Sequence, residues 1–175
     1  AVLDVSNNPK LKDLSCGNNR LTVLDLSKNS ELEILSCRKN GLTSLDLDAN
    51  KKIGEKILYL ENQFYHKGVL NAGETFDMKT LPGSFDPSRT KNWIGGTVDA
   101  AGILTVDADA TEVTYDYQTK SGNTDAKYLM PCKMQVRGGT TPPTTYTVSF
   151  DANGGSGTMA DVTGISGSYT LPATA

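Results

Sequence analysis

The stretch that decides the fold is "LSCGNNRLTVLDLSKN" at residues 14–29, which returns as "LSCRKNGLTSLDLDAN" at residues 35–50. Equivalent positions in the two copies are 21 residues apart. Further positions keep the same step: Leu3, Leu24 and Leu45; Asn8, Asn29 and Asn50; Cys16 and Cys37; Asn19 and Asn40. A fixed period of this length with L-x-x-L-x-L-x-x-N spacing is typical of a leucine-rich solenoid, in which stacked coils bury their apolar edges against one another.

Each copy contains two similar halves, L-x-C-x-x-N-x-L and L-D-L-x-x-N. This nested pattern resembles the 21-residue leucine-rich repeats of internalin-like bacterial surface proteins, and the resemblance covers residues 1–62. The repeat is less regular in "ILYLENQF" at 57–64, where we assign Ile57, Tyr59, Asn62 and Phe64 to the L, C, N and L slots. That assignment makes the last step 22 residues long and predicts one inserted residue before it.

Residues 63–139 have a different pattern, with short apolar and polar alternations rich in Val, Thr and Tyr between Gly, Asn and Asp residues. Such a pattern predicts a small all-β, sandwich-like domain. "DAAG" at 99–102 is expected to form a hairpin turn, and Trp93 is expected to fill the core. A strand-rich segment directly after leucine-rich repeats is similar to the Ig-like β-domain of many bacterial surface proteins.

A linker is predicted at residues 140–145, "TTPPTT", because two prolines stiffen it and threonines solvate it. In residues 146–175, "FDANGGSGTM" followed by "YTLP" resembles the start of a Listeria–Bacteroides repeat, a β-grasp-like module. The closing "LPATA" fits the strand end of that module better than a sortase signal, which ends in glycine. The predicted fold class is therefore mainly β: a short leucine-rich-repeat solenoid, an Ig-like all-β domain and a partial β-grasp-like module.

The composition excludes several classes of function. The net charge is −3 without a basic run, which argues against a nucleic-acid partner, and no apolar run is long enough to insert in a membrane. The N-terminus shows no signal-peptide pattern and begins inside a repeat, so we expect an exposed apolar edge at residues 1–3. Three cysteines do not make a disulfide framework.

Cys16 and Cys37 could be nucleophiles, metal ligands, a disulfide or small apolar side chains. No further ligands stand at metal-binding spacing, and the one histidine, His66, has no visible partner. Parallel side chains on stacked coils do not favour the disulfide dihedral. We therefore expect both thiols, and Cys132, to act as small buried hydrophobes.

Two acidic groups are candidate calcium ligands. The first is a column formed by Asp4, Asp25 and Asp46. Their carboxylates would repel one another, and Ca²⁺, water or neighbouring lysines could relieve that repulsion. The second is "VDADATE", where Asp107 and Asp109 would share one face of a strand near Glu112. Neither has the pattern of a complete calcium loop, so no cofactor is expected.

These patterns predict a non-catalytic binding or adhesion segment of a bacterial cell-surface or secreted protein. Its partner would be an extracellular protein or glycan, bound through exposed positions of the solenoid. The alternative is a structural spacer without a ligand of its own, and the sequence does not indicate an oligomeric state. The candidate partner-binding residues are Arg20, Asp25, Ser27, Ser36, Arg38, Lys39, Asp46 and Asp48.

Overall fold

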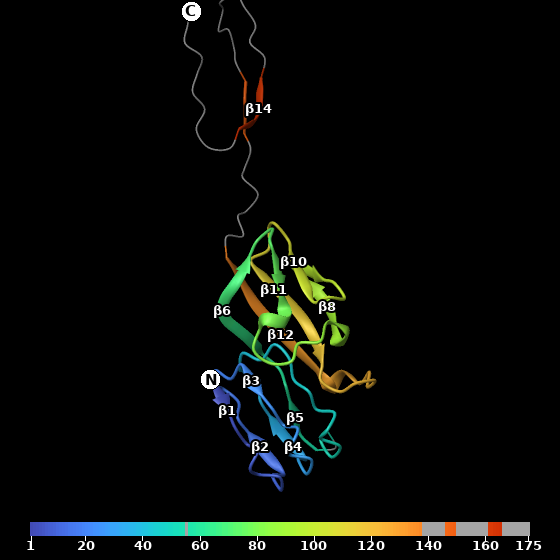
Figure 1. Cartoon of the computed structure of the whole chain (residues 1–175). Helices are drawn as coiled ribbons and strands as arrows, with labels where there is room; N and C mark the ends of the chain where they lie inside the picture. The colour runs from blue at the N-terminus through green and yellow to red at the C-terminus, as the bar shows by residue number, and fades with distance from the viewer. Residues whose placement is uncertain (55, 138–145, 150–160, 166–175) are drawn as a thin grey trace, which may run out of the picture. The chain divides into compact units, whose positions relative to one another are not determined.

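The chain is mainly β in the computed structural model, which describes residues 1–54, 56–137, 146–149 and 161–165 (Figure 1). It divides into two compact units, Ala1–Gly139 and Thr140–Ala175. In the described residues the only helices are three single turns of 3-10 helix: η1 (Met78–Thr80), η2 (Pro87–Arg89) and η3 (Ala126–Tyr128).

The N-terminal part of the first unit is a solenoid with two small parallel sheets, blue to teal in Figure 1. One sheet pairs β1 (Val2–Leu3) with β3 (Val23–Leu24). The other aligns β2 (Asp13–Ser15), β4 (Ile34–Ser36) and β5 (Leu58–Tyr59). Leu14 lies opposite Leu35, so the stacking expected from the 21-residue period is confirmed. Leucines from neighbouring coils, among them Leu26, Leu32, Leu35 and Leu47, fill the interior.

The register of the last coil differs from the expectation. Leu58 lies opposite Leu35 and Tyr59 opposite Ser36, so the step is 23 residues and not 22. Leu60 is buried, whereas Ile57 and Tyr59 are 42% and 46% exposed. The side chains of residues 57–60 point alternately inward and outward, whichever step is assumed. A shift of the step by one residue therefore exchanges the side chains that point inward with those that point outward. The assignment of Ile57 and Tyr59 to interior slots was therefore wrong.

Buried asparagines connect successive coils in the second half-repeat. The Nδ2 group of Asn29 donates to the carbonyl oxygens of Val5 and Asn8 at 3.0 and 2.8 Å. Asn50 repeats this one coil later, with Leu26 and Asn29 as acceptors at 3.0 and 2.8 Å. Each of these carbonyls also accepts a backbone N–H from its own turn, so the amide adds a second hydrogen bond that joins one coil to the next.

A second ladder runs through the first half-repeat. Asn40 donates through Nδ2 to the carbonyls of Cys16 and Cys37, and its Oδ1 accepts the backbone N–H of Leu21. In the last coil Gln63 takes this role, with Nε2 donating to the carbonyl of Cys37 at 3.0 Å. The longer glutamine bridges the same distance from a coil that carries two additional residues.

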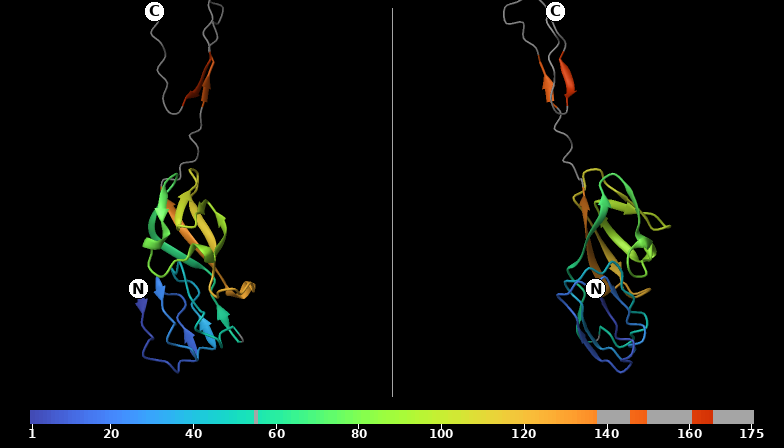
Figure 2. Two further views of the ribbon diagram at one scale, coloured as in Figure 1. Left: turned by 45° about the vertical axis from the view of Figure 1, so that its right-hand side comes forward. Right: turned by 60° about the vertical axis from the view of Figure 1, so that its left-hand side comes forward.

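The rest of the first unit contains two further sheets (Figure 2). One has the order β6-β12-β11-β8, with β6 parallel to β12 and the other pairs antiparallel: β6 (Gln63–Asn71), β12 (Leu129–Arg137), β11 (Glu112–Gln118) and β8 (Thr90–Ile94). The other is antiparallel with the order β7-β10-β9: β7 (Thr75–Asp77), β10 (Ile103–Val106) and β9 (Gly96–Val98).

Two local predictions for this part can be compared with the structure. The hairpin turn at 99–102 is confirmed, because β9 and β10 pair across it and the N–H of Gly102, at φ +90°, donates to the carbonyl of Asp99. Trp93 does not fill the core. It is only partly buried, and its ring stacks on that of the fully buried Tyr115 with centroids 4.4 Å apart.

The solenoid and the two sheets are joined directly within the first unit. Gln63, a member of the asparagine–glutamine ladder, is also the first residue of β6. The hydroxyl of Tyr115 donates to the carbonyl of Thr43 at 2.7 Å, and that of Tyr128 donates to the carbonyl of Ile53 at 3.1 Å. In a longer solenoid, the next coil would bond to these backbone groups of the last coils. Here the sheets form those hydrogen bonds.

In the second unit, the described strands are β13 (Tyr146–Val148) and β14 (Val162–Ile165), which pair antiparallel. The predicted linker at 140–145 and the "FDANGG" and "YTLP" motifs lie outside the described residues. The β-grasp-like module therefore stays a prediction.

Candidate partner-binding faces

The structure distributes the candidate residues over three places on the solenoid. Asp25, Ser27, Asp46 and Asp48 line one hollow of about 570 Å³ beside the second half-coils. Arg20 lines another of about 450 Å³, together with Phe64 and His66. Ser36, Arg38 and Lys39 lie on β4 and the turn after it. The acidic and basic candidates therefore belong to separate surfaces.

The aspartate column has a local structural role. Asp25 accepts the backbone N–H of Ser27 at 2.9 Å, and Asp4 and Asp46 make the same bond two residues on, at 2.9 and 2.8 Å. This bond is the largest cause of the lowered pKa of Asp25. Each carboxylate thus fixes the turn that follows it along the chain, as aspartate commonly does in Asx-turns.

Part of the acidic surface binds a residue of the same chain. Arg89, from η2, places its Nη1 3.5 Å from Asp46 Oδ1 and also pairs through Nη2 with Asp48. Its side chain is only 13% exposed. The Oδ1 of Asp48 accepts the backbone N–H of Ser121 at 2.7 Å. Asp46 and Asp48 therefore attach the sheets to the solenoid, and only part of each carboxylate remains open to a partner.

Asp48 is expected to make stability depend on pH. Partial burial raises the pKa of Asp48, but hydrogen bonds from Ser121 and Arg89 outweigh it and hold the pKa below the ordinary 3.8. Its stabilising effect is therefore complete above that ordinary pKa and is lost as the pH falls through the folded pKa. Asp48→Asn should lower the free energy of unfolding by about 1 kcal/mol at neutral pH, a value discounted for exposure.

Urea unfolding of wild type and Asp48→Asn at several pH values tests this expectation. The difference between the two proteins should be constant from neutral pH down to about pH 4 and should shrink below it. Asp99→Asn is a useful control, because Asp99 also accepts a backbone N–H, that of Ile103, but does so in an exposed turn. A difference that grows toward low pH would contradict the assignment.

An open face lies on the sheet β2-β4-β5. Ser15, Ser36 and Tyr59 are in register across its three strands. The guanidinium carbon of Arg38 lies 5.7 Å from the centroid of the Tyr59 ring. Ile57 and Tyr59 account for much of the exposed apolar surface of the last coil. We refer to Arg38, Ile57 and Tyr59 as the arginine–tyrosine face.

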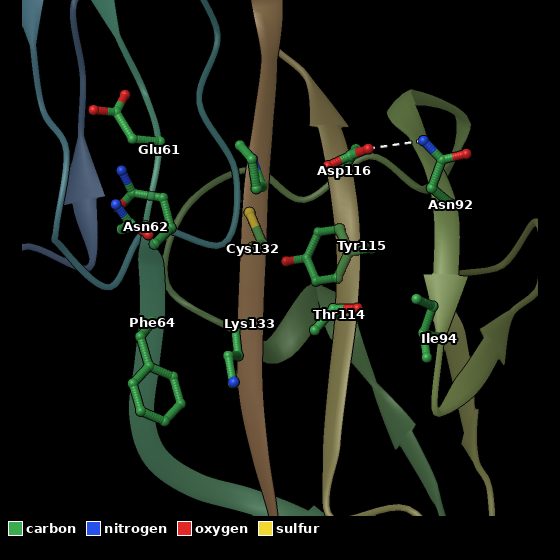
Figure 3. Close-up of a pocket in the computed structure, with 12 residues that line it drawn as sticks. Glu61, Asn62, Phe64, Asn92, Ile94, Thr114, Tyr115, Asp116, Cys132 and Lys133 are labelled. Atoms are coloured by element: carbon green, nitrogen blue, oxygen red, sulfur yellow. Dashed lines mark hydrogen bonds between the residues drawn. The ribbon is translucent and has the colours of Figure 1, made fainter.

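A groove of about 610 Å³ adjoins the last coil and crosses the outer side of the four-stranded sheet (Figure 3). Its lining includes Glu61, Phe64 and Lys133, and the figure shows Phe64 and Lys133 side by side on β6 and β12. At the opposite side Asn92 donates through Nδ2 to Asp116 Oδ2 at 2.7 Å. The groove therefore combines charged, amide and aromatic groups.

Sequence reasoning missed both the exposure of Tyr59 and the groove. A last step of 22 residues predicts that Tyr59 lies inside the solenoid. The available signal was the pair Leu58 and Leu60, which suits interior slots better than isoleucine and tyrosine. The groove joins residues from four strands distant in sequence, and no local pattern indicates such a combination.

The structure also bears on the hypotheses about calcium ligands and about the three thiols. Asp107 and Asp109 lie in a turn after β10 and not on one face of a strand, so that part of the expectation was wrong. Within the described ranges, no three His, Cys, Asp or Glu side chains are placed to hold a metal ion. Cys16, Cys37 and Cys132 are free and buried, and burial raises the pKa of each thiol.

The chain is similar to solved structures, one of which is described below. No protein-family model and no curated protein matches the chain. The solved structure is described as the functional domain of InlJ from Listeria monocytogenes, which includes a cysteine ladder. It is 24% identical with a TM-score of 0.46, and the match covers 77% of this chain and 31% of that one. This chain thus matches about a third of that structure. In the part of the chain that the structure describes, no helix is long and apolar enough to cross a membrane.

Proposed function

We propose that this chain is a non-catalytic binding or adhesion segment of a bacterial cell-surface or secreted protein, which recognises an extracellular protein or glycan through its solenoid. The observation that carries this proposal is the arginine–tyrosine face. Tyrosine and arginine are over-represented among residues that dominate binding energy. Here both are exposed and the guanidinium lies over the ring, with Tyr59 on β5 and Arg38 just after the neighbouring strand β4. The hollow beside Asp25 and Ser27 is a second surface of the same solenoid.

The fold that supports this surface is, in this proposal, an Ig-like sandwich joined to leucine-rich repeats. The strand orders β7-β10-β9 and β12-β11-β8 correspond to the B-E-D and G-F-C arrangements of Ig-like sheets. The inward side chains Leu104, Tyr115 and Tyr117 belong to one buried cluster. In this arrangement the sandwich covers the end of the solenoid and keeps its strands aligned.

Binding of the full chain to arrays of extracellular proteins and glycans tests the proposal. We expect a saturable ligand whose affinity falls at least tenfold in the variant Arg38→Ala/Tyr59→Ala. The matched variant Asp25→Asn/Ser27→Ala changes the acidic hollow instead and shows which surface is used. Circular dichroism checks that both variants remain folded. Saturable binding that neither variant weakens would contradict recognition through the solenoid.

A structural spacer is the second candidate. The observation that favours it is the junction, where Arg89, Tyr115 and Tyr128 tie the sheets to the last coils without a linker. Such a junction suits an element that holds other parts of a protein apart. Absence of any ligand on the arrays, together with unchanged adhesion of cells that display the alanine variants, would favour this function.

A further inference from the structure

The turn after each strand of the sheet β2-β4-β5 contains a residue in the left-handed region. These residues are Asn18, Lys39 and Asn62, with φ values of 56°, 55° and 62°. The N–H of Asn18 donates to the carbonyl of Arg38 at 2.9 Å, and that of Lys39 to the carbonyl of Glu61 at 3.0 Å. Stacking of the coils therefore imposes this backbone conformation on whichever residue occupies the slot.

Lysine is an unfavourable residue for this slot. Asparagine tolerates the left-handed region, whereas a long side chain with a Cβ is disfavoured there. Lys39 is exposed. No ion pair joins its ammonium to a carboxylate of the described residues. The backbone bond to Glu61 holds this conformation, but any residue in the slot would make that bond. The choice of lysine therefore directs attention to a role outside the fold.

The neighbouring residue, Arg38, is held in place by two other coils. A Cβ on Gly17 would lie 3.0 Å from the carbonyl oxygen of Arg38 and 3.2 Å from its Cγ, so the glycine makes room for the arginine stem. On the other side its guanidinium lies over the ring of Tyr59. Among the described residues, no carboxylate forms an ion pair with Arg38 either. Arg38 is therefore a positioned cation whose charge is not paired by any carboxylate in the described part of the chain.

Resting on the proposed function, we infer that Arg38 and Lys39 bind the carboxylates of an acidic peptide segment in a protein partner. The guanidinium fork matches a carboxylate with two parallel hydrogen bonds, and the ammonium adds a second positive charge beside it. The exposed apolar surface of Ile57 and Tyr59 adjoins this pair and favours a peptide over a glycan, because protein interfaces surround such charges with aromatic and aliphatic contacts.

The probe is a labelled peptide of alternating glutamate and leucine, titrated against the full chain, with the lysine analogue of the peptide as the reference. Lys39→Asn should weaken binding of the glutamate peptide about tenfold, or ~1.4 kcal/mol. The same variant should raise the melting temperature by roughly 2–4 °C, because it removes the backbone strain. Lys51→Asn removes an equal charge from an exposed site elsewhere and should change neither quantity. Gly17→Ala should also weaken binding, because it displaces Arg38 without changing charge.

Several outcomes would overturn the inference. One is a stabilised Lys39→Asn protein that binds the glutamate peptide as well as wild type. A second is equal affinity for the lysine analogue, and a third is selective binding of a sulfated glycan in place of the peptide. If an array ligand still depends on Tyr59 while the glutamate peptide does not bind, the acidic partner is wrong but the proposed function stands. If the glutamate peptide does not bind and array binding depends on neither Tyr59 nor the acidic hollow, both the inference and the proposed function are wrong.

Discussion

Replacement of Asn40 by alanine is expected to lower the free energy of unfolding by about 2–4 kcal/mol, because a buried polar group left without a partner costs roughly 1–3 kcal/mol and each further hydrogen bond that is lost costs roughly 0.5–1.5 kcal/mol. Asn40 is only 4% exposed. Its Oδ1 is the acceptor for the N–H of Leu21, which alanine would leave without that partner. The carbonyls of Cys16 and Cys37 would each lose one of two side-chain donors, because Asn19 and Gln63 also bond to them. Urea unfolding followed by circular dichroism measures the loss.

Asn19 provides the matched control, since it occupies the same slot one coil earlier. Its Nδ2 also donates to two carbonyls, those of Cys16 and Gly17, but the residue is exposed. Water can replace those bonds, so Asn19→Ala should cost less than about 1 kcal/mol. Equal losses for the two variants would show that burial of the ladder does not determine its contribution.

Gln63→Ala is the second large effect and is expected to cost about 2–4 kcal/mol by the same mechanism. Gln63 is 1% exposed, and its side chain bonds to the carbonyls of Cys37 and Leu60 and to the N–H of Leu42. Its neighbour Asn62 has a different role, because it holds the left-handed backbone position and is exposed. Asn62→Ala should therefore cost only about 1 kcal/mol, through backbone strain.

This pair of variants distinguishes the two possible registers of the last coil. With a step of 23 residues Gln63 is the ladder residue, whereas a step of 22 would give that role to Asn62. Asn62→Gly sharpens the comparison, because glycine adopts the left-handed region readily and should restore the stability that alanine loses. A larger loss for Asn62→Ala than for Gln63→Ala, without recovery in Asn62→Gly, would contradict the 23-residue step.

The sequence could predict the features that local repetition determines. Asn40 follows Asn19 by one period, and the leucines between them repeat, so stacking of the first coils could be expected from spacing alone. The hairpin turn at 99–102 could also be expected, because turn residues there separate two alternating segments. In each case neighbouring residues along the chain carry the whole signal.

Features that depend on distant residues could not be predicted in the same way. The contact of Arg89 with Asp48 joins positions 41 residues apart. The sequence around either residue does not indicate that the two side chains form an ion pair. The register of the last coil is a different case. Leu58 and Ile57 both fit an alternating pattern, and the preference of interior slots for leucine is a weaker signal than the spacing of the repeat. The exposure of Tyr59 follows from that register.

The two step lengths give the solenoid a modular construction. A unit of 21 residues adds one rung to each asparagine ladder and about 4.8 Å of length, the spacing between neighbouring strands. The coil that ends in Gln63 is an adapter, whose extra residues and longer amide fit the ladder to the sheets. Insertion or deletion of a whole 21-residue unit before that adapter would change the length of the solenoid in fixed increments. The contacts between the last coil and the sheets would stay the same.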